Sequence, residues 1–332
     1  MIKSLHQSLL TLDSHVDIPW PVGEDPFTET SRCLDIPKMR EGGLKAVCLV
    51  AYVPQGSLTP EGFEAATTRA LAMLDSINRI GHHAGMRRAS TVADIEAAAA
   101  ADQPAIVPVV ENGHAIGTDL ANIARFRALG ARYMTVTHNG HNAFADSSNP
   151  RSDLNDPPEE HGGLSALGRT AIAEMNLLGM VVDIAHVSKK SMLQAAEVSR
   201  TPVVSTHSCI RALCDNPRNL DDEQLDALRD VGGVVQITAV PSFLRAGKKA
   251  EDVTVSDYAD HVDYAVKRIG LAHVGLSSDF DGGGGFVKWR DAGESANVTA
   301  ELVRRGYGDA EIAALWGGNF LRVLKRAEDV AE

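Results

Sequence analysis

The sequence lacks the short motifs that mark several common enzyme classes. It contains no GxGxxG or P-loop for a nucleotide, no HExxH helix of the metalloproteases and no GxSxG turn for a serine nucleophile. Its four cysteines form no CxxC pair and no zinc-finger spacing, and two of them lie in apolar contexts typical of buried thiols. These absences exclude the usual nucleotide-binding, thiolate-metal and serine-hydrolase signatures.

Membrane and nucleic-acid signatures are also missing. No apolar run approaches the length of a membrane span, the N-terminal segment is too short and polar for a signal sequence, and the charged C-terminal residues do not resemble a lipid-anchor signal. The formal net charge of −12 argues against nucleic acid or an anionic membrane surface as a partner. We therefore expect a soluble, cytoplasmic protein with no nucleic-acid or membrane partner.

What the sequence does contain is a regular alternation of short apolar runs and helix-like segments. Its 332 residues are 44% hydrophobic and 23% charged, as in an ordinary globular protein. The apolar runs are expected as strands at 9–13, 44–53, 105–110, 133–137, 180–184, 202–205, 233–238 and 273–277. Helices are expected at 61–81, 91–101, 188–198, 221–231, 256–269 and 309–329.

Most of these apolar runs are continuous rather than alternating, which is typical of parallel strands buried on both faces. Eight strand–helix alternations without an obvious linker predict an α/β fold, a single-domain (β/α)8 TIM barrel over residues 1–332. An open doubly wound sheet is the alternative. Two long loops, at 139–168 and 280–297, follow the fourth and eighth strands, so in a barrel both lie over the face on which active sites form.

Polar side chains follow the strands at the ends that converge in a barrel. His15 and Asp17 are two residues apart, so on an extended backbone they leave the same face. Further residues of this kind end the third, fourth, fifth, sixth and eighth strands: Glu111, His138, Asp183, His186, His207, Asp279 and Asp281. In a barrel these ends meet at one pocket, however far apart they are in sequence.

Histidines and carboxylates without thiolates suit zinc, with other divalent transition ions as alternatives. A glutamate between two pairs of ligands suggests a bridge between two ions about 3.5–4 Å apart, an arrangement that activates water for hydrolysis. The fourth strand does not end in lysine, which disfavours a carboxylated-lysine bridge there.

The remaining histidines serve as a comparison set within the chain. We assign no role to six of them, which lie in loops, after or inside helices, or at the opposite end of a strand: His6, His82, His83, His161, His261 and His273. His114 and His141 lie near the predicted rim, where helix-start and loop roles are expected. Asp13 is expected to be structural, and Asp281 could cap a loop.

The ordered set of strand-end motifs resembles the membrane (renal) dipeptidase family. The motifs are His15-Val-Asp17-Ile-Pro, Glu111-Asn-Gly-His, Thr137-His138-Asn139, Asp183-Ile-Ala-His186, Ser205-Thr-His207-Ser and Ser278-Asp279-Phe-Asp281. Supporting matches are Pro217-Arg218-Asn219-Leu220, Pro241-Ser-Phe-Leu244 and Gly317-Gly-Asn-Phe-Leu321. The resemblance covers nearly the whole chain, and it is the order of the motifs that makes it specific.

This resemblance implies a barrel metallopeptidase with two zinc ions that hydrolyses L-Xaa-L-Xaa and L-Xaa-D-Xaa dipeptides. One zinc would be held by His15, Asp17 and Glu111, and the other by the bridging Glu111 with His186 and His207. A metal-bridging hydroxide would attack the peptide bond.

The same resemblance supplies three further roles. His138 would bind the substrate carbonyl or oxyanion, Arg218 the terminal carboxylate, and Asp279 would act as acid and base. The physics of the side chains agrees, because a guanidinium holds a carboxylate through two hydrogen bonds and a histidine beside an ion stabilises negative charge. The family's common dimeric state allows a homodimer.

The chain departs from the family pattern in three places. The usual Glu-Gly-Gly reads Glu111-Asn112-Gly113, an Asn-aromatic pair is absent before Pro241, and Phe144 lies where tryptophan is common. None of these changes removes an expected metal ligand. They concern the pocket that would select the side chains of the substrate. Two other readings stay open: a binuclear amidase that acts on a lactam or N-acyl amino acid, and a metal-bearing barrel without catalysis.

Overall fold

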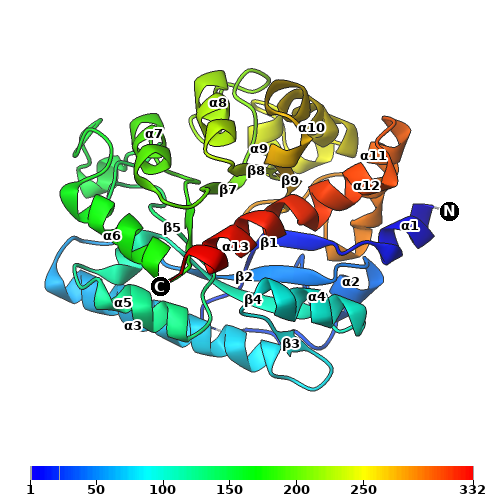
Figure 1. Ribbon diagram of the computed structural model, residues 1–332, viewed down its shortest axis with the longest axis horizontal. Coiled ribbons are helices and arrows are strands. Elements are labelled where there is room, and N and C mark those ends of the chain that lie inside the picture. Colours follow the sequence, from blue (N-terminus) through cyan, green and yellow to red (C-terminus); the bar gives the residue numbers. More distant parts are fainter. Residues whose placement is uncertain (1, 22, 332) are drawn as a thin grey trace.

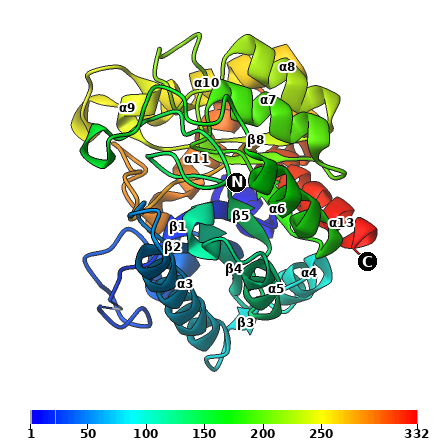
Figure 2. The same ribbon diagram turned by 90° about the vertical axis from the view of Figure 1, so that its left-hand side faces the viewer.

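The computed structural model describes residues 2–21 and 23–331, and a parallel β-barrel lies at its centre (Figures 1 and 2). Neighbouring strands follow the order β1-β2-β4-β5-β6-β7-β8-β9. Their bounds are β1 Leu12–Asp17, β2 Ala46–Tyr52, β4 Ala105–Glu111, β5 Tyr133–Thr135, β6 Val181–Asp183, β7 Val204–Ser208, β8 Val234–Ile237 and β9 Val274–Leu276. The amide of Asp17 donates to the carbonyl of Phe280 at 3.0 Å, and that of Asp279 to the carbonyl of His15 at 3.1 Å. These bonds join the two end strands, so the expected (β/α)8 barrel is confirmed.

Helices surround the barrel (Figure 2). They are α1 Ile2–Ser8, α2 Ile36–Glu41, α3 Pro60–Gly81, α4 Val92–Ala100, α5 Ala121–Ala128, α6 Ala166–Leu177, α7 Lys189–Val198, α8 Asp222–Asp230, α9 Pro241–Leu244, α10 Val255–Ile269, α11 Ala296–Arg304, α12 Asp309–Ala313 and α13 Asn319–Val330. Polar caps start several of them: the side chain of Thr91 accepts from the amide of Asp94, and Asp221 forms a capping box with Gln224. None of the described helices has the length and apolar character needed to cross a membrane.

Both faces of the barrel wall are buried, as the continuous apolar runs predict. In β2, Val47 and Leu49 belong to the large core cluster between strands and helices, while Cys48 and Val50 belong to a second cluster. That second cluster includes Tyr133 of β5 and Phe320 of α13, whose ring centroids lie 6.4 Å apart. Helix α13 therefore packs against one end of the barrel, and the polar strand ends face the other.

Several boundaries differ from the sequence-based expectations. Strand β1 starts at Leu12 rather than residue 9, and the short strand β3 (Arg87–Arg88) was not expected. The long loops end in helices that begin at Ala166 and Ala296, inside the ranges expected to be irregular. Helices α1, α2, α5, α6, α9 and α11 were also not expected.

The expectation of one continuous helix over 309–329 is wrong in its middle. A π-helical turn spans Ala314–Gly318 between α12 and α13. A Cβ atom on Gly317 would lie 2.8 Å from the carbonyl oxygen of Leu10, so this turn approaches the backbone before β1 very closely. A contact between residues this far apart in sequence cannot be read from a helical pattern.

Candidate active site

Two of the strand-end histidines lie on β-bulges. The register between β1 and β2 shifts between Asp13 and Val16, which flank His15. The register between β7 and β8 shifts in the same way between Ser205 and Ser208, which flank His207. A bulge bends its strand and re-aims a side chain, and bulges are frequent next to active sites. Here they allow both imidazoles to turn into the mouth of the barrel.

Backbone conformations that most side chains avoid occur at the same rim. His186 has a φ of 67° and Asp279 a φ of 59°, and Asn112, directly after Glu111, has a φ of 81°. Left-handed conformations of non-glycine residues cost energy and cluster at functional sites, where the surrounding structure enforces them. The fold thus holds His186 and Asp279 in place at some cost to stability.

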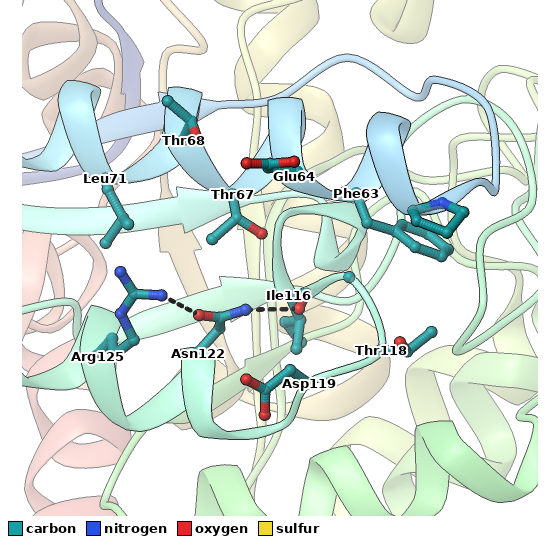
Figure 3. A pocket seen from close by; sticks show the side chains of 12 residues that line it. Phe63, Glu64, Thr67, Thr68, Leu71, Ile116, Thr118, Asp119, Asn122 and Arg125 are labelled. Carbon is teal, nitrogen blue, oxygen red and sulfur yellow. Dashed lines mark hydrogen bonds between the residues drawn. The ribbon is translucent and has the colours of Figure 1, made fainter.

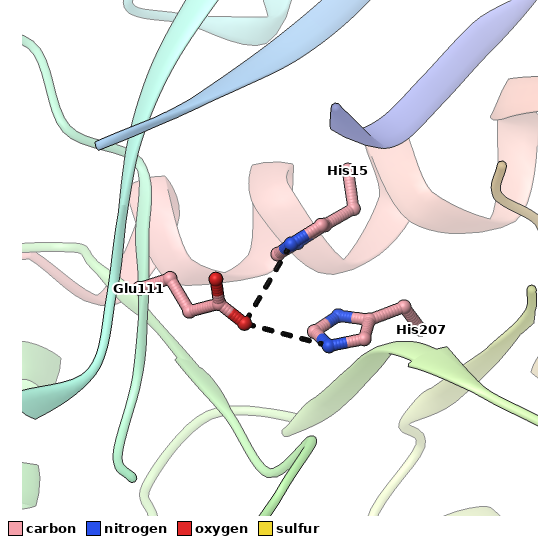
Figure 4. A group of neighbouring side chains, drawn as sticks. All are labelled: His15, Glu111 and His207. Atoms are coloured by element: carbon pink, nitrogen blue, oxygen red, sulfur yellow. Dashed lines mark ion pairs between the residues drawn. The ribbon is translucent and has the colours of Figure 1, made fainter. Parts of the chain in front are cut away.

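The carboxylate of Glu111 faces the imidazoles of both His15 and His207 (Figure 4). Its Oε1 atom is 3.7 Å from Nε2 of His15, 3.5 Å from Nε2 of His207 and 3.2 Å from Nε2 of His186. Three overlapping groups of potential metal ligands result: His15 with Glu111 and His207, Glu111 with His138 and His186, and His15 with Asp17 and Asp279. We call these seven residues the rim cluster.

Several polar atoms of the rim cluster are buried without a partner. Among the described residues, neither Nε2 of His15 nor Oδ1 of Asp17 has a hydrogen-bond partner. The Nε2 atoms of His186 and His207 face one another at 2.8 Å. Buried polar atoms normally find partners, and two ring nitrogens at this distance repel unless a proton or a cation lies between them. The donor set therefore fits divalent cations, and its nitrogen and carboxylate character suits zinc.

Burial and mutual charge set the pKa values of this cluster. Burial, with repulsion from Glu111 opposed by His15, raises the pKa of Asp279 to about 7, and burial with repulsion from Glu111 raises that of Asp17 well above its usual value. Burial would also raise the pKa of Glu111, but the nearby imidazoles outweigh it and hold that pKa well below its usual value. Burial lowers the pKa of His207 well below its ordinary value. A neutral His207 beside an ionised Glu111 is the state that metal ligation requires.

A cavity of about 410 Å³ opens beside the rim cluster. Its walls include Arg218, which is 3% exposed and whose Nε atom has no hydrogen-bond partner among the described residues. The Nη2 atom of Arg218 donates to the carbonyl of His207 at 3.2 Å, and its guanidinium carbon lies 5.4 Å from the centre of the Phe243 ring. A buried guanidinium with an unused N–H is suited to bind an anionic group such as a carboxylate.

The structure brings every sequence-predicted site residue to this one region. Five are expected ligands and three are expected to bind or convert substrate: His15, Asp17, Glu111, His186, His207, His138, Arg218 and Asp279. Asp281 lies outside the rim cluster and accepts from the amides of Cys33 and Leu34, so it caps a loop. His114 also stays apart, buried with its Nδ1 3.3 Å from the amide of Gln55.

Sequence reasoning assigned no role to the other residues that line the cavity, although three of them belong to the quoted motifs. These other lining residues are Asn139, Asn149, Asn216, Pro217, Val240, Phe243 and Gly282. Asn139 directly follows His138, and Phe243 belongs to the short helix α9 after β8, so their place after strands was an available signal. Asn149 lies within the long loop after β5, whose path depends on contacts distant in sequence.

Asn112, a departure from the expected glycine, has a structural explanation. Its side-chain amide donates to the carbonyl of Val53, and its carbonyl oxygen accepts from the amide of His114 and the side chain of Asn142. Asparagine tolerates positive φ better than most residues do. The substitution thus ties the end of β4 to the loop after β5 and leaves Glu111 in place.

A second cavity, of about 540 Å³, lies between α3 and α5, away from the rim cluster (Figure 3). The side chain of Asn122 there donates to the carbonyl of Ile116 and accepts from Arg125. Thr67 donates to the carbonyl of Ala115. These polar groups already bond one another, in contrast to those of the rim cluster.

Comparisons with known proteins agree on one family. The family model described as membrane dipeptidase, peptidase family M19, matches residues 1–332. The dipeptidase aclJ of Aspergillus oryzae is 34% identical over 305 residues, which are 90% of this chain and 71% of that protein. The dipeptidase tcpJ of Claviceps purpurea is 32% identical over 313 residues, 92% of this chain and 72% of that protein. The crystal structure of the probable dipeptidase PvdM from Pseudomonas aeruginosa is 30% identical, covers 99% of this chain and 98% of its own, and superposes with a TM-score of 0.93.

Proposed function

Because the chain belongs to the membrane dipeptidase family, and is therefore a metal-dependent dipeptidase, we propose that its rim cluster binds two zinc ions and hydrolyses L-Xaa-L-Xaa and L-Xaa-D-Xaa dipeptides. His15, Asp17 and Glu111 would hold one ion. Glu111, His186 and His207 would hold the other, with Glu111 shared between the two. The buried, unpartnered atoms of His15 and Asp17 support this assignment, since each would gain a partner from a bound cation.

The opposite wall of the cavity orients the substrate. Arg218 binds the C-terminal carboxylate through a forked pair of hydrogen bonds, which uses its unpartnered Nε. His138 of the rim cluster also lines the cavity and stabilises the negative charge that develops on the scissile carbonyl oxygen. A dipeptide is thereby held at its carboxylate and at its one peptide bond.

Asp279 carries the proton. It lines the cavity, its Oδ1 lies 3.8 Å from Nε2 of His15, and burial raises its pKa to about 7, where a carboxyl group can both accept and donate near neutral pH. When bound, the zinc ions lower the pKa of water to near 7 and polarise the carbonyl. Asp279 takes the proton that the attacking water releases and passes it to the leaving nitrogen.

One observation carries the proposal: incomplete cation ligands and an unsatisfied buried guanidinium line the same cavity. The test compares three forms of one compound with the zinc-loaded protein: L-Ala-L-Ala, its N-acetyl derivative and its C-terminal amide. We expect rapid hydrolysis of the dipeptide, weaker hydrolysis of the amide, and a preference for the free amine over the N-acetyl form. Cleavage of the N-acetyl compound in preference to the dipeptide would contradict the proposal.

A further inference from the structure

A layer of buried polar side chains lies directly behind the rim cluster. It consists of Tyr133 and Thr135 of β5, Asp183 of β6 and Thr206 of β7, all fully buried, and we call it the floor. We propose that Thr206 and Tyr133 are positioning residues, which fix the ring orientation of His207 and His15 so that both Nε2 atoms point at the metal site, and that Asp183 fixes the direction of the Thr206 hydroxyl. This inference rests on the proposed metal binding, and it assigns roles to residues that are not themselves ligands.

Asp183 anchors the floor because it accepts hydrogen bonds on both of its oxygens. Oδ1 accepts from the amides of Ala185 and Thr206, both at 3.0 Å. Oδ2 accepts from the hydroxyls of Thr135 at 2.5 Å and Thr206 at 2.8 Å. Four donors satisfy the acceptor capacity of a carboxylate. The hydroxyl hydrogen of Thr206 is therefore committed to Asp183.

A hydroxyl whose hydrogen is committed can only accept from its other neighbours. Oγ1 of Thr206 lies 2.9 Å from Nδ1 of His207, so this nitrogen must be the donor of that bond. The Nε2 atom of His207 then presents its lone pair, and it lies 3.5 Å from Oε1 of Glu111. Asp183 thus acts on the ligand through one intervening hydroxyl. Carboxylates behind metal-bound histidines perform the same task elsewhere.

Tyr133 does the same for His15. The hydroxyl of Tyr133 donates to the carbonyl of Ser14 at 2.8 Å, so it accepts from Nδ1 of His15 at 2.9 Å. This leaves Nε2 of His15, which has no partner among the described residues, facing Glu111 and the cavity side of the cluster. Both bulge-borne histidines are therefore oriented from behind by a neutral hydroxyl.

The two positioning residues are not equivalent. Oγ1 of Thr206 also lies 3.4 Å from Nδ1 of His15, and the rings of His15 and His207 are 3.9 Å apart between centroids. Loss of the Thr206 hydroxyl therefore affects both imidazoles, while loss of the Tyr133 hydroxyl affects His15 alone. This asymmetry gives the inference a specific signature in metal binding.

The test measures zinc affinity rather than activity. Metal-free protein is titrated with zinc against a chromophoric chelator, which yields both dissociation constants for each variant. We expect Thr206→Val to weaken both sites by about 10–100-fold, the range typical of lost outer-shell partners. Tyr133→Phe should weaken one site only, and Thr206→Ser, which keeps the hydroxyl, should restore near-wild-type affinity.

Matched controls separate orientation from general damage to the barrel. Thr137→Val makes the same substitution at a buried threonine whose Oγ1 has no partner among the described residues, and it should leave zinc affinity unchanged. Tyr258→Phe removes a buried hydroxyl that donates to the carbonyl of Ile237 and accepts from the amide of Ser277, neither of them a proposed ligand, and should also leave affinity unchanged. Folded Thr206→Val protein that binds both zinc ions with wild-type affinity would overturn the inference.

A measurement on the wild-type protein tests the proposed orientation of His15 and His207 even if the Thr206→Val variant fails to fold. Long-range proton–nitrogen correlation spectra of the zinc-loaded protein report which ring nitrogen of each histidine carries the hydrogen. Nδ1–H on both His15 and His207 is expected, and Nε2–H on either would overturn the inference. Wild-type protein that binds zinc but cleaves no dipeptide would contradict the proposed function, and the affinity comparison would still test the floor.

Discussion

Two clusters of side chains in this molecule both contain carboxylates, and they differ in whether all of their polar atoms have partners. On the outer helices, the guanidinium of Arg305 donates to Glu301 through Nε at 2.8 Å, to Asp263 through Nη1 at 2.5 Å and to Asp260 through Nη2 at 2.8 Å. We call this group the outer cluster. Every nitrogen of Arg305 has a carboxylate partner, whereas the rim cluster leaves buried atoms of His15 and Asp17 without any. The outer cluster is complete as folded, whereas the rim cluster keeps unpartnered buried atoms that the proposed cations would satisfy.

The largest expected effect comes from removing the centre of the rim cluster. Glu111→Gln removes the charge that faces three imidazoles, and we expect the rate of dipeptide hydrolysis to fall at least about 10⁴-fold, a large part of what such enzymes achieve. Zinc content by mass spectrometry should fall below two per chain. Glu301→Gln, the same change in the outer cluster, should leave both quantities unchanged. Full activity of Glu111→Gln protein would disprove the central role of this carboxylate.

The next effect separates chemistry from metal binding within the rim cluster. Asp279→Asn removes the proton carrier, and we expect kcat to fall roughly 10²–10⁴-fold, the usual contribution of general acid–base catalysis. Zinc content should stay at the wild-type level because the proposed ligands remain. If the variant lost zinc along with activity, Asp279 would be a ligand rather than the acid and base.

Arg218 should act on substrate binding. Arg218→Met removes the partner of the C-terminal carboxylate and should raise KM about 10–100-fold, as expected for the loss of hydrogen bonds to a charged group. The wild-type enzyme should discriminate between a dipeptide and its C-terminal amide, and the variant should not. Equal discrimination by both proteins would place the carboxylate elsewhere.

The two clusters should respond to pH with opposite signs when metal is absent. Burial and neighbouring charge raise the pKa of Asp279 to about 7, while burial opposed by Glu111 leaves the pKa of His15 raised, to about 10. The native protein therefore keeps protons that the unfolded chain has lost, on Asp279 below about pH 7 and on His15 up to about pH 10. Its stability falls as pH rises, and from about 6.5 to about 10 the fall follows His15. Thermal unfolding with a chelator should show a falling Tm over this interval. Zinc-loaded protein should not show this fall, because bound cations replace the protons.

The smallest effect concerns the outer cluster alone. Hydrogen bonds from Arg304, opposed by burial and assisted by Arg305, lower the pKa of Glu301 to about 2. This contribution is present above the usual glutamate pKa and is lost as pH falls towards 2. Glu301→Gln should cost about 1 kcal/mol of unfolding free energy at neutral pH, since such pairs are screened by solvent. Urea unfolding at neutral pH and at about pH 3 measures it, and the cost should shrink at the lower pH.

The sequence predicted the barrel well because its strands are buried on both faces. All eight predicted barrel strands have counterparts in the structure, and the errors lie at their ends, where the bulges at His15 and His207 alter the register. The interruption before α13 was not predictable, since it depends on the approach of Gly317 to the backbone of Leu10. The predicted cytoplasmic location, homodimer and single-domain organisation remain predictions.

The candidate site was predictable to the same extent as the fold. Ligand-type side chains stand out at strand ends because the barrel brings those ends together. The floor was not visible in the sequence, because Thr206 and Tyr133 are ordinary strand residues. Their importance depends on bonds that cross the barrel, such as the one that joins Tyr133 to His15. Residue type and spacing in the sequence do not indicate such contacts.

We propose that the rim cluster becomes a dipeptidase site by binding two cations. The most direct test adds zinc stepwise to metal-free protein and records hydrolysis of a mixed L-Xaa-L-Xaa and L-Xaa-D-Xaa dipeptide library at each step. We predict that activity rises with added zinc and levels off at two equivalents per chain. Protein that holds two zinc ions and cleaves no member of the library would contradict it.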